Sequence, residues 1–324
     1  MAPSGHELVS RHHFVTAFAP ASIGNVGVGF DMLGLALQGV GDRVSVRRRD
    51  DDRIVVAEVR AADGKPHPEL STQPDRNTAS IAAAALWRAA GVGDGLEIVL
   101  HKGIPLQSGM GSSAASAVAA VVAANALLES PFGTPQLLTF ALEGEKFASG
   151  GLHADNVAPS LLGGLVLCPP ASLPETVSLK LPTGLRSVLL HPHLRVETAK
   201  ARRDLAKSYT MEQWLTQQGY LATFVLACER NDHRLIGRSL RDAVIEPQRA
   251  GSVPCFHAVK TAALRAGALG CSLSGSGPSV FALCSDELAP TVVQVMEEAC
   301  RASGTGCESW ISPMNSPGAH VLVS

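Results

Sequence analysis

A glycine- and serine-rich stretch, residues 105–115, contains the groups best suited to bind a phosphate. Gly109 and Gly111 let the backbone approach an anion closely, and the hydroxyls of Ser112 and Ser113 can donate to phosphate oxygens or ligate Mg²⁺. The alanine-rich segment that follows predicts a helix, whose first N–H groups and positive dipole end attract anions. The stretch alone supports phosphate binding and a plain turn before a core helix about equally well.

The loop is not a Walker-type P-loop, because no lysine follows its last glycine. Two other glycine-rich stretches flank it in the chain: PASIGNVGVGFDMLGLAL at residues 20–37 and GCSLSGSGPSVFAL at residues 270–283. A single glycine turn is usually only a turn. Three such stretches in this order form a specific combination, which favours a phosphate-binding enzyme over a chance turn.

These stretches resemble the three motifs of the GHMP small-molecule kinases (galactose, homoserine, mevalonate and phosphomevalonate kinases). Within that superfamily, GNVGVGFDMLGLAL, EGEKFASGGLHADNVAPSLLGG and VIEPQRAGSVPCF are similar to the homoserine kinases. The resemblance runs from about residue 15 to the C-terminus. It implies ATP as phosphoryl donor, Mg²⁺, L-homoserine as the small-molecule acceptor, and a homodimer.

The resemblance also implies a fold class, α+β, with a ribosomal-protein-S5-like N-terminal domain and a ferredoxin-like C-terminal domain. Residues 168–184 contain four prolines and little periodicity, which is typical of a boundary between domains. We therefore expect a nucleotide-binding domain at residues 1–172. Residues 173–324 are expected to complete the substrate site.

The nucleotide-binding role falls on the whole loop, with two departures from the family pattern. The residues concerned are Pro105, Leu106, Gln107, Ser108, Gly109, Met110, Gly111, Ser112, Ser113, Ala114 and Ala115. Relatives commonly have glycine where Gln107 stands and leucine where Met110 stands. Gln107 restricts the backbone at its position, or its side chain contacts the nucleotide; the sequence leaves both open.

The resemblance assigns catalytic roles to a hydroxyl, a carboxylate and an amide. Glu145 matches the family's metal-binding glutamate and Ser113 the hydroxyl ligand, whereas Glu143 is expected to be solvated. Asn156 stands where mevalonate and galactose kinases have an aspartate that can act as base. Because an amide cannot accept a proton in that role, we expect Asn156 to orient the acceptor hydroxyl. Its proton then passes to phosphate or is lost late, which fits a loose transition state.

An amino-acid acceptor needs partners for a carboxylate and an ammonium group. Arg202 and Arg249 match the family's carboxylate-binding arginines, and bidentate guanidinium geometry suits a carboxylate. Either could instead be a surface arginine, as Arg203 is expected to be. The other residues assigned by resemblance are Asn25, Asp31 for the ammonium, His153, Asp155, and Thr198 near the reacting hydroxyl.

Local patterns add two expectations about these segments. If residues 153–156 are extended, His153 and Asp155 point the same way; taken alone, His153 is more often a structural histidine. The glycines of the third motif would let it pack against the phosphate loop, with Ser276 near the substrate or the γ-phosphate.

Strands and helices mix along the chain without a regular βαβ rhythm, which favours α+β over a doubly wound sheet. Strands are expected at residues 14–18, 42–48, 54–59, 96–101, 163–168, 185–190, 279–284 and 319–323. Helices are expected at residues 78–90 with Asn77 as N-cap, 113–128, 134–148, 211–230, 234–240, 255–266 and 290–302.

The composition indicates a folded cytoplasmic protein. The 324 residues are 46% hydrophobic, and a net charge of −2 gives no reason to expect nucleic acid or an anionic membrane as partner. The N-terminal residues 1–13 lack an apolar signal core, and no apolar run reaches the about 18 residues of a membrane span. The charge run at residues 47–53 is expected to be a solvated strand end or turn.

The histidines and cysteines of the chain do not indicate a metal site or a disulfide. An odd count of seven scattered cysteines without a Cys-x-x-Cys pair predicts free buried thiols. His12, His13, His191 and His193 are candidate metal ligands, but His191 and His193 lack nearby acidic or cysteine partners, so no transition-metal site is expected. Two alternatives stay open: a GHMP kinase for a different small alcohol, and a non-catalytic member that only binds ligand.

Overall fold

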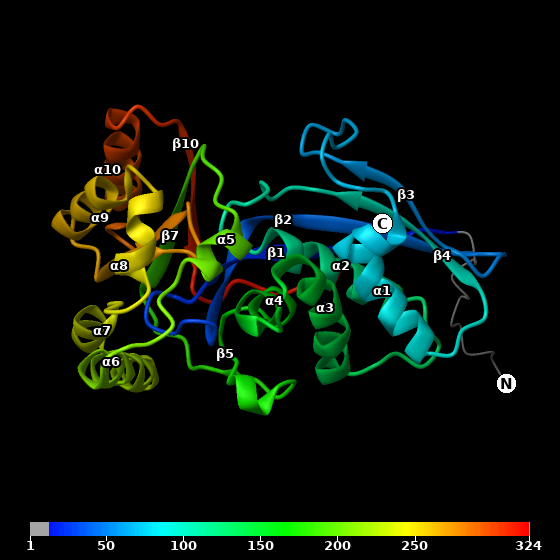
Figure 1. Ribbon diagram of the computed structural model, residues 1–324, viewed down its shortest axis with the longest axis horizontal. Coiled ribbons are helices and arrows are strands. Elements are labelled where there is room, and N and C mark those ends of the chain that lie inside the picture. Colours follow the sequence, from blue (N-terminus) through cyan, green and yellow to red (C-terminus); the bar gives the residue numbers. More distant parts are fainter. Residues whose placement is uncertain (1–12, 324) are drawn as a thin grey trace, which may run out of the picture.

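The computed structural model describes residues 13–323, so His12 lies outside the described residues. Two sheets form the frame of the molecule (Figure 1). The first has seven strands, with β11-β1-β2-β4-β3 in spatial order and β5 and β6 beside β2. Its strands are β1 (Val15–Gly24), β2 (Leu33–Arg49), β3 (Ile54–Arg60), β4 (Gly95–His101), β5 (Leu165–Leu167), β6 (Val177–Ser178) and β11 (His320–Val321).

Four helices lie together on one side of this sheet in Figure 1: α1 (Thr78–Ala89), α2 (Ser112–Asn125), α3 (Thr134–Ser149) and α4 (Ala154–Leu162). The central helix, α2, packs on β1 and β2 and also on α1, α3 and α4. Its alanine and valine side chains are buried nearly all round. Small residues allow this close approach, and a helix that is apolar on every face belongs in a core. The phosphate loop therefore ends on a helix held from several sides.

The second sheet has the spatial order β10-β7-β9-β8, with antiparallel neighbours. Its strands are β7 (Leu185–Pro192), β8 (Gly270–Leu273), β9 (Val280–Ser285) and β10 (Cys307–Pro313). Helices α9 (Phe256–Arg265) and α10 (Ala289–Ala302) pack on each other and on the sheet. In chain order this is β-α-β-β-α-β, the ferredoxin-like arrangement that the resemblance implied.

The other helices connect the two sheets or flank the second. They are α5 (Thr198–Arg203), α6 (Met211–Arg230), α7 (His233–Ser239) and α8 (Glu246–Arg249), with short 3₁₀ turns η1 (Pro74–Arg76), η2 (Pro170–Ser172) and η3 (Ala250–Ser252). Strands β6 and β11 lie beyond residue 172 yet pair with β5 and β1 of the first sheet. The division at residues 172 and 173 therefore remains a prediction.

Most of the expected elements are confirmed, and the differences lie where local signals are weak. Asn77 caps α1 as predicted, its side-chain oxygen accepting from the Ala79 N–H at 3.0 Å. Strand β2 starts nine residues earlier than the expected Asp42 because the glycine-containing segment from Leu33 is paired with β1 and β5. Strands β6, β8 and β10 and helices α4, α5 and α8 were not expected. These elements are stabilised by sheet pairing and packing, and the sequence shows no periodic pattern that would predict them.

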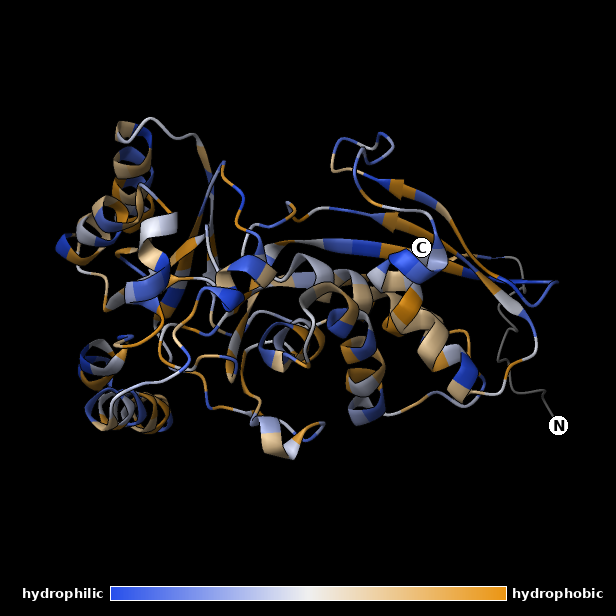
Figure 2. Cartoon of the chain, in the orientation of Figure 1, coloured by the Kyte–Doolittle hydropathy of each residue, from blue (hydrophilic) through white to orange (hydrophobic). Residues whose placement is uncertain are grey.

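Strands β3 and β4 carry orange stretches in Figure 2, whereas part of β2 is blue and the helices show both colours. The seven cysteines are free and six are buried, as predicted. Residues 47–49 end β2 and residues 50–52 form the following bend, which confirms the interpretation of the charge run. No helix between residues 13 and 323 is long and apolar enough to cross a membrane.

Candidate active site

A cleft of about 440 Å³ opens between the four-helix layer and the second sheet. Its size falls within the range of small-molecule sites. The predicted site residues that line it are Asn25, Asp31, Leu106, Gln107, Ser108, Gly109, Gly111, Ser112, Ser113, Glu145, His153, Asp155, Asn156, Thr198, Arg202 and Arg249. Residues separated by more than 200 positions in the chain thus share one cavity.

Four residues of the predicted loop do not line this cleft. Met110, Ala114 and Ala115 are fully buried in the core, and Pro105 lines a neighbouring cavity. The N–H group of Ala115 is already bound to the carbonyl of Gly111 at 2.9 Å. The side chains available to a ligand are therefore those of the loop's other residues.

The glycines of the loop meet both a conformational and a packing demand. Gly109 and Gly111 have φ values of 73° and 68°, in the left-handed region. A Cβ atom on Gly109 would lie 2.5 Å from the carbonyl oxygen of Ser274, and one on Gly111 would lie 2.3 Å from the Ser22 hydroxyl. Gly111 is also the N-cap of α2, so the free N–H groups of the first helical turn face the same region.

The backbone at Gln107 has the same left-handed conformation, and the residue also lines the cleft. Its φ is 54°, so a non-glycine residue occupies a left-handed conformation at a cost of about 1 kcal/mol. Its carbonyl accepts from the N–H of Val196 at 3.1 Å, which ties the loop to the segment before α5. Glycine at this position, as relatives commonly have, would adopt the conformation without strain.

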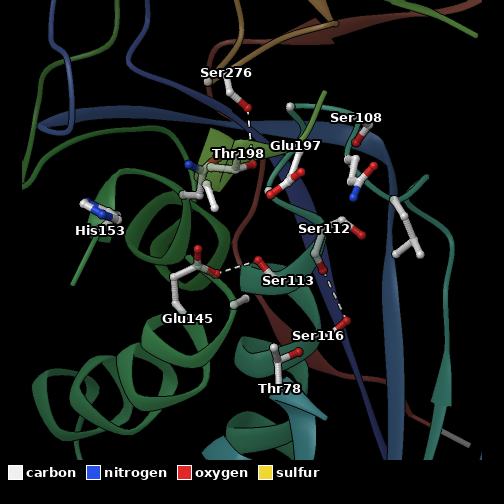
Figure 3. Close-up of a pocket in the computed structure, with 18 of the residues that line it drawn as sticks. Thr78, Ser108, Ser112, Ser113, Ser116, Glu145, His153, Glu197, Thr198 and Ser276 are labelled. Atoms are coloured by element: carbon white, nitrogen blue, oxygen red, sulfur yellow. Dashed lines mark hydrogen bonds between the residues drawn. The ribbon is translucent and has the colours of Figure 1, made fainter. Parts of the chain in front are cut away.

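The third motif packs on the phosphate loop, as the sequence predicted. The hydroxyl of Ser274 donates to the carbonyl of Gly109 at 2.6 Å, and the Ser279 N–H donates to the carbonyl of Ser108 at 3.2 Å. Ser276 lines the cleft with its Oγ 3.3 Å from Oγ1 of Thr198 (Figure 3). The hydroxyl of Ser108 is buried and has no hydrogen-bond partner among residues 13–323, so it is available to a ligand.

A buried ion pair beneath the loop was not expected from the sequence. The ammonium of Lys102 donates to Asp42, and also to the carbonyl of Ser112 and the hydroxyl of Ser116, both at 2.8 Å. The other oxygen of Asp42 accepts from the N–H of Gly103 at 2.9 Å. Burial lowers the pKa of Lys102, while the charge of Asp42 opposes that shift. The pair thus holds both ends of the phosphate loop from inside the core.

The two predicted metal ligands meet in the cleft. The hydroxyl of Ser113, in the first turn of α2, donates to Oε2 of Glu145 at 2.6 Å, and the two side chains point toward one another in Figure 3. Glu145 is 8% exposed, whereas Glu143 is exposed, which confirms that Glu143 is the solvated one. Both groups are hard oxygen donors of the kind that Mg²⁺ takes beside substrate phosphates. The described residues contain no cluster of three His, Cys, Asp or Glu side chains that could hold another metal.

The segment that carries Asn156 is helical rather than extended, so the condition under which His153 and Asp155 were expected to point the same way is not met. His153 is the N-cap of α4, and Asp155 and Asn156 lie in its first turn. The carbonyl oxygen of the Asn156 amide accepts from the Ser22 hydroxyl at 2.9 Å, and its amide nitrogen donates to Asp155 at 3.2 Å. These two bonds fix the orientation of the amide beside Gly111 of the phosphate loop.

Asp155 is a buried carboxyl group in the cleft. Its Oδ2 accepts from the N–H of Asn25 at 3.2 Å. Burial, then the negative charges of Asp31 and Glu145, raise its pKa to about 7. Burial also lowers the pKa of His153, whose Nδ1 lies 3.7 Å from Asp31.

The charged groups expected to bind an amino acid lie together. Arg202 donates to both oxygens of Asp31, at 2.9 and 2.7 Å. The residue predicted to bind the acceptor's carboxylate therefore forms an ion pair with the residue predicted to bind its ammonium group. Arg249 donates to the carbonyl of Gly275 at 3.0 Å. The Nε atoms of both arginines are buried and have no hydrogen-bond partner among the described residues. Arg203 is exposed beside Glu197, as predicted.

Several residues of the cleft were missed by sequence reasoning. They are Leu70, Arg76, Asn77, Thr78, Leu100, Lys102, Ser116, Phe147, Ala148, Glu197 and Ala199. The sequence indicated Asn77 as a helix cap but not as a site residue. The alternating pattern around Leu100 indicated only a strand. Thr78 enters the site because the start of α1 lies against α3, which carries Phe147 and Ala148, and no local pattern in the sequence indicates this packing.

Comparisons with known proteins show the family to which the chain belongs. The family models described as GHMP kinases N terminal domain and GHMP kinases C terminal match residues 77–164 and 224–302. A homoserine kinase of Xylella fastidiosa (strain M12) is 44% identical over 311 residues, covering 96% of this chain and 94% of that protein. One of Chloroherpeton thalassium is 42% identical, with 95% and 99% covered. The crystal structure of homoserine kinase from Cytophaga hutchinsonii superposes with a TM-score of 0.92 at 40% identity, covering 99% of this chain and all of that one.

Proposed function

Because the chain belongs to the homoserine kinases of the GHMP kinase family, we propose that it transfers the γ-phosphoryl group of ATP to the side-chain hydroxyl of L-homoserine. The products are O-phospho-L-homoserine and ADP. One structural observation supports this proposal in addition to the family membership. A single cleft joins a glycine-rich loop at a helix start to two buried guanidinium groups whose Nε atoms lack partners.

The loop supplies the phosphate end of the site. The first N–H groups of α2 and the positive end of its dipole attract the phosphates, and the hydroxyls of Ser108 and Ser112 can donate to their oxygens. Lys102 and Asp42 keep the loop in this shape from beneath. Positioning and charge stabilisation are the main contributions that a protein makes to phosphoryl transfer.

Ser113 and Glu145 are the residues that would hold Mg²⁺, since their oxygens face each other beside the loop. When bound, the ion neutralises charge on the phosphates. Glu145 supplies the carboxylate, and Ser113 keeps its hydroxyl aimed at the same place.

Asn156 orients the acceptor hydroxyl, held by its bonds to Ser22 and Asp155. The oxygen of the acceptor forms a bond to the γ-phosphorus while the bond to the bridging oxygen of ADP breaks. The hydroxyl proton leaves late, to a phosphate oxygen or to solvent, because Asn156 cannot take it. Thr198 and Ser276 place two further hydroxyls beside the reacting groups.

Recognition of the amino acid falls to the charged end of the cleft. The free Nε groups of Arg202 and Arg249 suit a carboxylate, which would complete their hydrogen bonding. Asp31 and Asp155, with Asn25 and His153 beside them, provide the negative side for the ammonium. A kinase for a neutral sugar would have no use for both arginines.

An assay of ADP release with MgATP and four separate acceptors tests the proposal: L-homoserine, mevalonate, galactose and shikimate. We expect turnover with L-homoserine and little with the others. Turnover of another alcohol with L-homoserine inert would favour a different GHMP kinase. Failure to bind MgATP in a calorimetric titration would favour a non-catalytic member.

We also propose, from the family resemblance, that the enzyme is a cytoplasmic homodimer. Light scattering after gel filtration would test the oligomeric state. A molar mass of about twice the 33.7 kDa of the chain is expected.

A further inference from the structure

One aromatic ring contacts both arginines of the acceptor site. The Cζ atom of Arg202 lies over the ring of Phe30 at 5.4 Å from its centroid, and that of Arg249 at 5.2 Å. The arginines come from α5 and α8, whereas Phe30 belongs to the loop between β1 and β2. Both distances are within the range in which a cation is attracted to an aromatic face.

The two guanidinium groups need such a partner because they repel each other. Asp31 balances Arg202 with two hydrogen bonds. Among residues 13–323 no carboxylate lies within ion-pairing distance of Arg249, which donates only to the Gly275 carbonyl. Burial, and next the charge of Arg202, lower the pKa of Arg249. The negative face of an aromatic ring offsets this repulsion without adding a charge that would compete with a carboxylate ligand.

The backbone around Phe30 is held firmly. The side-chain oxygen of Asn25 accepts from the Asp31 N–H at 3.0 Å, and the Gly29 N–H donates to the Asn25 carbonyl at 2.8 Å. The side chain of Gln217, on α6, donates to the carbonyl of Val28 at 2.7 Å. Phe30 is therefore presented from a fixed loop of the first sheet to two helices that follow β7.

We propose that Phe30 is a positioning residue for the recognition of the acceptor's carboxylate, its ring holding Arg202 and Arg249 together in the orientation that the carboxylate requires. This inference rests on the proposed function of the two arginines. Phe30 acts through them and does not itself contact the reacting atoms.

An aromatic ring and an aliphatic side chain can fill the same space, but only the ring attracts cations. Replacement by leucine therefore removes the attraction while keeping an apolar group. Replacement by tyrosine keeps the ring. The two variants separate a cation-binding role from simple packing.

The test measures steady-state kinetics with L-homoserine and with L-homoserine amide, which lacks the carboxylate. We expect Phe30→Leu to raise KM for L-homoserine about five- to tenfold, with kcat and KM for ATP within about twofold of the wild type. Phe30→Tyr should stay within about twofold throughout. With the amide, kcat/KM should be the same for Phe30→Leu and wild type, because the arginines have no carboxylate to bind.

Phe14→Leu is the matched control. The Cζ atom of Arg47 lies over the ring of Phe14, 4.8 Å from its centroid, but neither residue lines the cleft. Phe14→Leu should leave kcat and KM unchanged for L-homoserine and for its amide. That result would exclude a general effect of losing an aromatic ring.

Arg249→Ala separates failure of this inference from failure of the proposed function. If Arg249→Ala raises KM for L-homoserine and Phe30→Leu does not, only the role of Phe30 is lost. If Arg249→Ala changes nothing, the carboxylate role of the arginines is lost as well. An equal loss of kcat/KM toward L-homoserine and its amide in Phe30→Leu would show a packing role and overturn the inference.

Pentafluorophenylalanine in place of Phe30 keeps the test decisive if the leucine variant folds poorly. Fluorination preserves the ring's shape and removes its negative face. We expect an unchanged melting temperature with a raised KM for L-homoserine; an unchanged KM would contradict the proposal.

Discussion

The phosphate loop and the acceptor site share one cleft but are built in different ways. The loop is one continuous segment followed by its own helix, and it is supported by the buried pair of Asp42 and Lys102. The acceptor site gathers the β1–β2 loop, α4, α5 and α8, and its principal pair, Asp31 and Arg202, is partly exposed. At the phosphate loop, the charged groups of Asp42 and Lys102 hold the backbone in place. At the acceptor site, the charged groups line the cleft, where a substrate can bind them.

The largest expected effect comes from the pair that supports the loop. Lys102→Met leaves the carboxylate of Asp42 buried without its counter-charge, which should lower the free energy of unfolding by about 3–5 kcal/mol. Arg202→Met breaks the partly exposed pair of the acceptor site and should cost about 1 kcal/mol or less. Chemical denaturation of both variants measures the contrast. Equal losses would contradict the division between a structural and a functional ion pair.

Glu145→Gln tests chemistry at the phosphate end without changing the shape of the side chain. We expect kcat to fall about 100-fold or more, because a carboxylate that would hold Mg²⁺ is lost. Glu143→Gln, on the same helix and exposed, is the control and should leave kcat unchanged. A kcat for Glu145→Gln within about twofold of the wild type would remove Glu145 from the metal site.

At the acceptor end, the perturbed carboxyl predicts a dependence on pH. Because the pKa of Asp155 is about 7 in the folded protein, kcat/KM for L-homoserine should fall about tenfold for each unit of pH below 7 as the carboxyl takes up a proton. Asp155→Asn should have a lower kcat/KM that no longer varies in this range. A persistent ionisation near pH 7 in the variant would assign it to another group.

The same shift has a consequence for stability. Folding raises the pKa of Asp155 from 3.8 to about 7, so the folded state binds the proton more tightly. The stabilising contribution is fully present below about pH 4 and is lost as the pH rises to 7. Asp155→Asn should remove this decline from the stability measured between these two pH values.

The smallest effect concerns Gln107. Gln107→Gly relieves the left-handed strain but gives the unfolded chain more freedom, so a gain in stability of at most about 1 kcal/mol is expected. Gln107→Val should instead lose about 1–2 kcal/mol, because a β-branched side chain tolerates this conformation poorly. Thermal unfolding of the two variants measures the difference, and a more stable valine variant would refute the explanation.

Several features of the molecule could be predicted from the sequence because they depend on neighbouring residues. The helix cap at Asn77, the helix after the phosphate loop and the solvated charge run follow from local propensity and periodicity. The helical start of α4 could not, since His153 caps it without a side-chain hydrogen bond and its first residues gave no periodic signal. The motifs indicated the family and most of the residues that line the cleft.

By itself, the sequence determined the phosphate loop, its glycines and the type of each charged group in the site. Only the tertiary structure decided that Lys102 turns inward to Asp42, that Gln107 is strained and that Phe30 meets two arginines. The physical reason is the distance along the chain. A glycine turn followed by a helix is indicated by neighbouring residues, whereas the contacts of Phe30 with Arg202 and Arg249 arise only when both sheets have packed.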